Sequence, residues 1–207
     1  MKICETFRSI QGEGLTIGSV TYFIRSVGCN LACRWCDTKY SRTGGEEMSV
    51  PEIMERAADE RNICVTGGEP LLQDDIYELL DALLDAGKNI VLETNGSVDI
   101  SEVPKNERLM ISMDIKCPSS GMSDKMIFSN IDLLRPSDQL KFIIADGSDL
   151  EYALDLIASR DIKCVVILTP AGGTDIEPLA EEAIGRGLNV RVLPQLHKII
   201  WGSSRGV

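Results

Sequence analysis

Three cysteines near the amino end of the chain have types and spacing that suit metal chemistry. Cys29, Cys33 and Cys36 are spaced C-x3-C-x2-C and directly follow an apolar, β-branched run, 20–27, that predicts a strand. In a [4Fe–4S] cluster each iron takes one thiolate, so three cysteines leave the fourth iron without a protein ligand. Such an open iron can bind a small molecule, and the spacing favours this kind of site.

Two alternatives to an iron–sulfur cluster remain open at this point. A structural zinc site needs four ligands, so it would have to recruit Cys64, Cys117 or His197. The three cysteines could also be ordinary reduced thiols. The chain has seven cysteines, an odd number, which argues against a disulfide framework and fits a reducing compartment. We expect the cysteines outside the motif to be packed apolar groups, and the single histidine, His197, to be structural.

The cysteine spacing resembles that of the radical S-adenosylmethionine (SAM) superfamily, in which SAM chelates the fourth iron. Segments 7–14 (FRSIQGEG), 35–38 (WCDT), 66–70 (TGGEP) and 93–96 (ETNG) extend the resemblance to the 7-carboxy-7-deazaguanine synthase family. This resemblance implies conversion of 6-carboxy-5,6,7,8-tetrahydropterin to 7-carboxy-7-deazaguanine, with loss of ammonia, in queuosine and 7-deazapurine biosynthesis. It also implies a [4Fe–4S] cluster, SAM and Mg²⁺, an electron donor such as flavodoxin or ferredoxin, and is compatible with a homodimer.

The resemblance assigns substrate-binding roles to segments on both sides of the cysteines. Arg25 lies in an apolar strand, where its planar fork suits the substrate carboxylate, although an ion pair to Glu5 or Glu13 is the structural alternative. The segment 10–13 would hold the pterin edge, since an amide and a carboxylate supply donors and acceptors. The full predicted substrate set is Ile10, Gln11, Gly12, Glu13, Arg25, Thr66 and Val207.

The remaining predicted site residues would bind the cluster, SAM and magnesium. Cys29, Cys33 and Cys36 would hold the cluster, and Thr38 corresponds to the magnesium position, with a helix cap or a turn as its alternative. Gly68 lacks a side chain, so its backbone can approach the SAM amino group closely. The predicted SAM-binding residues are Trp35, Asp37, Gly68, Glu69, Ser112, Asp114 and Lys116. The alignment around 112–116 does not decide which of these side chains contacts SAM. It is equally undecided whether Lys141 does so.

Elements of two kinds alternate along the chain and must position these residues. Short β-branched runs alternate with amphipathic ones, the pattern of parallel strands joined by crossover helices. We therefore predict an α/β fold, and the resemblance implies a partial (βα) barrel of the radical SAM type, with its chemistry at the carboxyl ends of the strands. The predicted strands are 3–9, 20–27, 63–66, 89–93, 109–115, 139–145, 164–169 and 189–193. The predicted helices are 50–61, 75–86, 150–160 and 176–186.

Length and charge limit the classes of function. The 207 residues fit a single domain, 1–207, and we draw no internal boundary. The net charge of −11 supplies no basic field for a phosphate backbone, so we expect no direct nucleic-acid binding. No signal peptide or bilayer-spanning apolar run is visible, which predicts a cytoplasmic protein without a membrane contact.

Three functional hypotheses compete. The first is a radical SAM enzyme acting on a small pterin. The second is a radical SAM activating enzyme that installs a radical on a partner protein, and the third is a noncatalytic zinc or electron-transfer module. The segment 11–14 before the cysteines favours the first, because a noncatalytic module would have no ligand for the glycine-rich loops.

Overall fold

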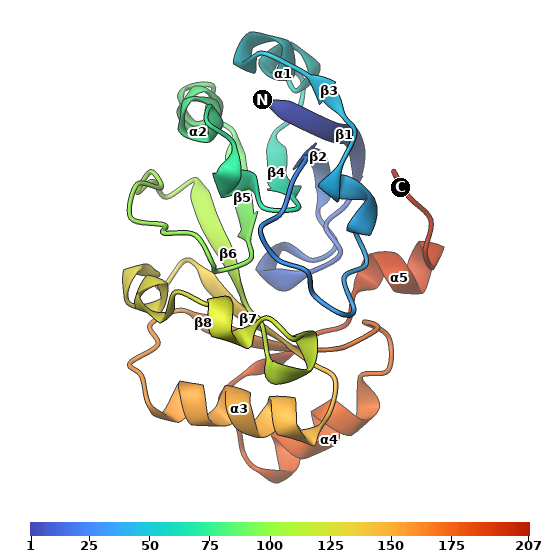
Figure 1. Cartoon of the computed structure of the whole chain (residues 1–207), viewed down its shortest axis with the longest axis vertical. Coiled ribbons are helices and arrows are strands. Elements are labelled where there is room, and N and C mark those ends of the chain that lie inside the picture. The colour runs from blue at the N-terminus through green and yellow to red at the C-terminus, as the bar shows by residue number, and fades with distance from the viewer.

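One nine-stranded sheet runs through the computed structural model, which describes residues 1–207 (Figure 1). Its strands lie in the order β3-β1-β2-β4-β5-β6-β7-β8-β9. From β2 to β9 every neighbouring pair is parallel, whereas β1 pairs antiparallel with both β2 and β3. The bounds are β1 Lys2–Ile10, β2 Val20–Ser26, β3 Glu46–Glu47, β4 Asn62–Gly67, β5 Asn89–Thr94, β6 Leu109–Ile115, β7 Gln139–Ile144, β8 Val165–Pro170 and β9 Arg191–Val192.

Helices connect most of the parallel strands, as crossover connections require. The α-helices are α1 Val50–Arg56, α2 Ile76–Asp85, α3 Gly147–Ala158, α4 Glu177–Gly185 and α5 Leu196–Trp201. Short 3₁₀ helices are η1 Gly14–Thr16, η2 Lys39–Arg42, η3 Pro70–Leu72, η4 Pro118–Ser120, η5 Ser123–Lys125 and η6 Phe128–Leu133. None of the α-helices has the length and apolar character needed to cross a lipid bilayer.

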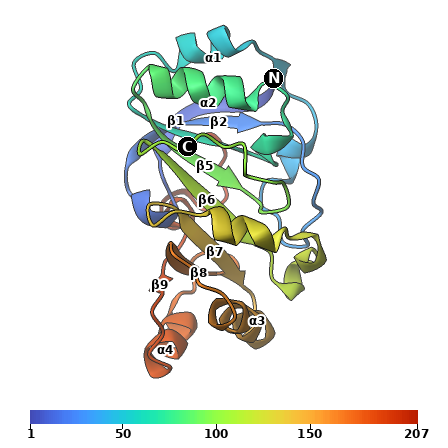
Figure 2. The same ribbon diagram turned by 90° about the vertical axis from the view of Figure 1, so that its left-hand side faces the viewer.

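The two faces of the sheet have different chemistry, because successive side chains of a strand point to opposite faces. Ile63 and Val65 of β4, for example, belong to the main apolar core, together with Leu79 and Leu83 of α2. Cys64 lies between them in sequence and faces the other side, where it packs with Phe23 in a much smaller apolar cluster. One face therefore carries the main core, to which α1, α2, α3 and α4 contribute (Figure 2). The opposite face carries polar strand residues such as Arg25, Glu93 and Lys141.

The predicted fold class is confirmed. The two outermost strands, β3 and β9, do not pair with each other, so the sheet forms an open, partial barrel. Each predicted strand has a counterpart, and β6 has the predicted bounds 109–115. The predicted extra strand at 3–9 is β1, which lies beside β2.

Some predicted boundaries differ from the structure. The first helix ends at Arg56 rather than 61, because the chain turns there and the buried Lys88 ammonium donates to the carbonyl oxygens of Ala57, Ala58 and Glu60, at 3.1, 2.5 and 2.7 Å. The third helix begins earlier than predicted, at Gly147, because the Asp146 side chain caps its first turn. Helix α5 and the 3₁₀ helices were not predicted.

Candidate active site

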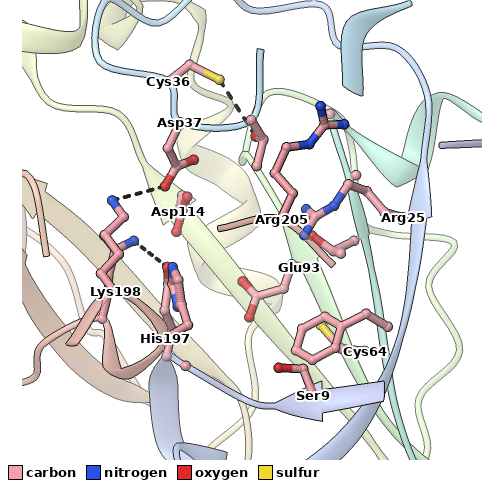
Figure 3. Close-up of a pocket in the computed structure, with 18 of the residues that line it drawn as sticks. Ser9, Arg25, Cys36, Asp37, Cys64, Glu93, Asp114, His197, Lys198 and Arg205 are labelled. Atoms are coloured by element: carbon pink, nitrogen blue, oxygen red, sulfur yellow. Dashed lines mark hydrogen bonds and ion pairs between the residues drawn. The ribbon is translucent and has the colours of Figure 1, made fainter. Parts of the chain in front are cut away.

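A cavity of about 570 Å³ opens on the polar face of the sheet, and 38 residues line it. The lining comes from β1 and the connection after it, from the carboxyl ends of β2, β4, β5, β6 and β7, and from the carboxyl-terminal segment (Figure 3). Most of the residues predicted to bind substrate, SAM or metal are brought together here: Ile10, Gln11, Gly12, Glu13, Arg25, Cys29, Cys33, Trp35, Cys36, Asp37, Thr38, Thr66, Gly68, Asp114, Lys116 and Val207. Glu69 and Ser112 are not among the lining residues.

The three motif cysteines are free thiols on one wall of the cavity. The Cys29 sulfur lies 3.4 Å from the Leu31 amide and 3.7 Å from the Asn95 side-chain nitrogen. Burial raises the pKa of the Cys33 thiol, an effect that the nearby Lys116 ammonium opposes. Three free thiols on one wall suit an iron–sulfur cluster, in which each cysteine meets a different iron.

A glycine gives the cluster loop its close contact with the end of β4. A Cβ atom at Gly68 would lie 2.1 Å from the Gly28 carbonyl oxygen and 2.8 Å from Cys29 Cβ, closer than side chains approach. The Glu69 amide donates to the Gly28 oxygen at 2.8 Å, which fixes this approach. The residues present therefore fit a cluster loop packed directly against the end of β4, because only glycine permits so close an approach of the two backbones.

Glu69 and Ser112 are buried beneath the cavity wall, where protein groups surround them. The Glu69 carboxylate accepts hydrogen bonds from the Leu71 amide, the Thr94 hydroxyl and the Asn95 amide, at 3.1, 2.9 and 2.6 Å. Burial outweighs these donors and raises the pKa of Glu69 to about 7. The Ser112 hydroxyl donates to Glu93 at 2.8 Å. In this structure both side chains orient neighbouring residues instead of facing the cavity.

Lys141 of β7, which lines the cavity, joins three carboxylates: Glu13 in the connection after β1, Glu93 of β5 and Asp114 of β6. Its ammonium group lies 2.8 Å from Glu13, 2.7 Å from Glu93 and 3.4 Å from Asp114. Burial disfavours the charged lysine, but the carboxylates outweigh it and raise the Lys141 pKa. Burial also raises the pKa of Glu93, whereas for Glu13 the lysine overcomes burial and lowers the pKa to about 2.

A second lysine stands closer to the cysteines. The Lys116 ammonium lies 2.6 Å from Asp114 and 5.8 Å from the centre of the Trp35 ring. Burial opposes the charge on Lys116, but Asp114 and the Cys33 thiol raise its pKa. The Trp35 indole donates to the Ser119 hydroxyl at 3.1 Å, which fixes the ring at the cavity edge. This wall thus offers an ammonium group and an aromatic face near the cluster loop.

The connection between β1 and β2 forms the side of the cavity opposite the cysteines. Gln11 is buried, and its side-chain nitrogen lies 3.6 Å from the Cys64 sulfur. A Cβ atom at Gly12 would lie 2.0 Å from His197 Nδ1, so this glycine permits close packing with α5. His197 lines the cavity, and burial lowers its pKa. Sequence reasoning had treated His197 as structural, and nothing in the segment 194–198 placed it near residue 12.

Part of the Arg25 guanidinium group has no hydrogen-bond partner in the chain and can bind a ligand. Its Nε donates to Glu5 at 2.8 Å, the ion pair weighed as the structural alternative. Tyr40 donates to the same Glu5 oxygen at 2.9 Å. The two terminal nitrogens of Arg25 have no partner within the chain, although the side chain is only 13% exposed. An anion in the cavity can therefore meet an arginine that is already oriented.

The residues after the cysteines and the carboxyl-terminal segment lie next to each other. Asp37 forms an ion pair with Lys198 of α5 at 3.2 Å, and the Thr38 hydroxyl is 3.7 Å from the Cys36 sulfur (Figure 3). Thr38 precedes η2 but makes no side-chain capping bond, so the Cys36 sulfur is the one hydrogen-bond partner of its hydroxyl. Val207 lines the cavity mouth and is 38% exposed.

Sequence reasoning missed Glu93 as a site residue and left Lys141 ambiguous. The signal for Glu93 was the same as for Arg25, a lone charged residue within an apolar strand. The pairing of Lys141 with Glu13 had no local signal, because these residues are 128 positions apart.

Comparison with known proteins assigns the class. A model of the Radical SAM superfamily matches residues 23–127, and the chain belongs to this superfamily, whose members use a [4Fe–4S] cluster and SAM. Its fold is similar to that of QueE from Escherichia coli, with a TM-score of 0.73 and 24% identity over 93% of each chain. A Streptococcus suis SuiB structure is also similar, with a TM-score of 0.62 and 14% identity over 83% of this chain and 47% of that one.

Curated relatives identify the particular family. The chain is 42% identical to a 7-carboxy-7-deazaguanine synthase of Thermoplasma acidophilum, with both chains covered completely. It is 45% identical to the corresponding protein of Methanospirillum hungatei, over 97% of this chain and 85% of that one. The chain is a member of the 7-carboxy-7-deazaguanine synthase family.

Proposed function

We propose that the chain converts 6-carboxy-5,6,7,8-tetrahydropterin to 7-carboxy-7-deazaguanine with loss of ammonia, the reaction that its family membership supports. The observation that carries the proposal is that the motif cysteines and the partly free guanidinium of Arg25 line one cavity. The cluster side suits radical chemistry and the arginine side suits a carboxylate. The product belongs to queuosine and 7-deazapurine biosynthesis.

Cys29, Cys33 and Cys36 would hold the cluster, and the backbone at Gly68 would hold SAM. Trp35, Asp37, Asp114 and Lys116 stand around that position, whereas Glu69 and Ser112 would act through the residues they orient. When bound, the cluster and SAM supply a one-electron reduction and a carbon-centred radical able to remove a hydrogen atom from the substrate.

The protein's own groups would position the pterin on the other side of the cavity. Arg25 would bind the carboxylate through its terminal nitrogens, and Gln11, Gly12 and Thr66 would meet the ring. The Glu13 carboxylate, fixed by Lys141 and Gln195, keeps acceptor capacity for ring N–H groups. Ile10 and Val207 would exclude water at the edges. Such fixed geometry directs one substrate hydrogen toward the radical.

The proposal includes one Mg²⁺ ion, with the Thr38 hydroxyl as its protein ligand. Because one hydroxyl binds Mg²⁺ weakly, substrate oxygens and water would complete the coordination shell. Thr38→Ala should raise the Mg²⁺ concentration needed for turnover, and Thr38→Ser should restore the wild-type requirement. Equal turnover with and without a chelator would show that Thr38 is not a magnesium ligand.

The remaining features follow from the resemblance and the composition. We propose that a flavodoxin or ferredoxin is the electron donor and that residues 1–207 form a single domain. We also propose that the protein is a homodimer and is located in the cytoplasm. Sedimentation of the reconstituted protein tests the dimer, and reduction by purified flavodoxin tests the donor.

The decisive experiment is anaerobic reconstitution followed by incubation with reductant, SAM and the carboxylated pterin, with mass analysis of the products. We expect 7-carboxy-7-deazaguanine only when the pterin is present. Cys29→Ala should abolish SAM cleavage, while Cys164→Ala, a buried thiol outside the cavity, should retain it. If zinc binds without iron, the cluster assignment is wrong. If the pterin stays unchanged and a partner protein acquires a radical, the chain is an activating enzyme instead.

A further inference from the structure

Two arginine side chains from opposite ends of the chain meet on one tyrosine at the cavity wall. The guanidinium carbon of Arg205 lies 3.4 Å from the centre of the Tyr40 ring. That of Arg25 lies 6.0 Å from the same centre. Figure 3 shows both side chains on the same side of the cavity, and both residues line it. A flat guanidinium packed against an aromatic ring is held in a fixed plane, with its edge free for hydrogen bonds.

The two arginines differ in their partners within the chain. Glu5 is the carboxylate paired there, and Arg25 and Tyr40 both donate to its Oε1 atom, at 2.8 and 2.9 Å. Arg205 makes no ion pair with any carboxylate of the chain. Arg205 therefore carries a charge that no carboxylate of the chain pairs, and an anionic ligand would pair it.

We propose that Arg205 is the second guanidinium of a carboxylate-binding subsite that it forms with Arg25 across Tyr40. This inference rests on the proposed function and adds a specificity-determining residue to it. The ligand is the carboxylate of the bound pterin. Tyr40 fixes both partners, because its ring supports Arg205 and its hydroxyl holds the Glu5 carboxylate that orients Arg25. The carboxyl-terminal segment thereby selects carboxylated pterins over those that lack the group.

The test compares two unreactive ligands, 6-carboxypterin and pterin without the carboxylate, by equilibrium binding to reconstituted enzyme with SAM. Arg205→Ala should weaken 6-carboxypterin binding about tenfold or more, the usual effect of losing a charge-assisted hydrogen bond, and leave pterin binding unchanged. Tyr40→Leu should act in the same direction, since it removes the ring that supports Arg205. Arg191→Ala is the matched control, because Arg191 is exposed on β9 and does not line the cavity.

The outcomes separate this inference from the proposed function. Suppose that wild type binds 6-carboxypterin and that Arg205→Ala lowers the affinity for both ligands equally, or for neither. The assignment of Arg205 to the subsite is then wrong, and the proposed function stands. If wild type binds neither ligand and makes no product, the proposed function fails and the subsite with it. Thermal unfolding of Arg205→Ala should match wild type, since the side chain is exposed and outside the core.

Discussion

Glu69 couples the stability of the fold to pH. The carboxyl group has no exposed surface, and burial raises its pKa to about 7 from an ordinary 4.5. A carboxyl with a raised folded-state pKa binds more protons in the native state than in the unfolded state between these values. Its contribution to stability is therefore complete below about pH 4.5 and is lost as the pH rises through 7.

We predict that Glu69→Gln removes this pH-dependent component. Between pH 4.5 and pH 8 the free energy of unfolding of the variant should rise relative to wild type by up to about 3 kcal/mol. Urea denaturation of both metal-free proteins at the two pH values measures the difference. Parallel stability profiles for the two proteins would contradict the raised pKa.

Some site residues were predictable one at a time, and others only as pairs. Cys29, Cys33 and Cys36 form a local motif, so their spacing alone indicated a shared ligand. Lys141 became interpretable only with its partner Asp114, because the two meet through the β6–β7 register. Register between distant strands is a property of the folded sheet and has no local signal in the sequence.

The turn after β4 packs directly against the cysteine loop, so a change in this turn should affect both stability and cluster binding. Gly68→Ala would place its Cβ 2.1 Å from the Gly28 carbonyl oxygen, and backbone on both sides leaves little room to shift. We predict less iron per chain after reconstitution and a loss of about 1–3 kcal/mol in unfolding free energy, as expected for overpacking.

Gly147→Ala is the control for this prediction. A Cβ atom at Gly147, in the first turn of α3, has no heavy atom within 4 Å. Iron content and urea denaturation should match wild type there. Full iron loading of Gly68→Ala would show that the loop does not need this close approach.

The end of α1 depends on a single buried lysine. Lys88 donates to the carbonyl oxygens of Ala58 and Glu60, which no backbone amide reaches, and to that of Ala57, which also accepts from the Glu60 amide at 3.1 Å. Lys88→Met keeps most of the length of the side chain but removes all three N–H donors, and we predict a loss of about 2 kcal/mol or more in unfolding free energy. Urea denaturation measures it, with the exposed Lys105→Met as control. Equal losses in the two variants would contradict the capping role.

The elements themselves were largely predictable, because burial leaves a periodic pattern. The segment 109–115 was a continuous apolar run and is β6 at the same bounds. Helix α5 escaped prediction because it has only six residues and none of them is fully buried, and Ile199 and Ile200 are exposed. Its position comes from long-range contacts such as the Leu196 amide to the Gly12 carbonyl oxygen at 2.8 Å.

At the scale of the whole molecule, the net charge of −11 sets which partners can approach. Clustered lysines and arginines are needed to displace counterions from a nucleic-acid backbone, and the acidic excess opposes this. We predict no saturable binding of transfer RNA near physiological salt. Fluorescence anisotropy with labelled RNA measures this, and a basic RNA-binding domain serves as the positive control. A saturable signal that weakens with added salt would contradict the prediction.

The cavity takes its walls from both ends of the chain, from residues 7–13 and from residues 195–207. During synthesis on a ribosome, the cysteine loop emerges long before the last wall has been made. The nascent protein therefore exposes its three thiols to solvent, to oxidants and to competing metals until residues 195–207 fold across the cavity. Iron and sulfide that arrive during translation would reach an exposed cysteine loop. After folding is complete, they must enter through the mouth of the cavity.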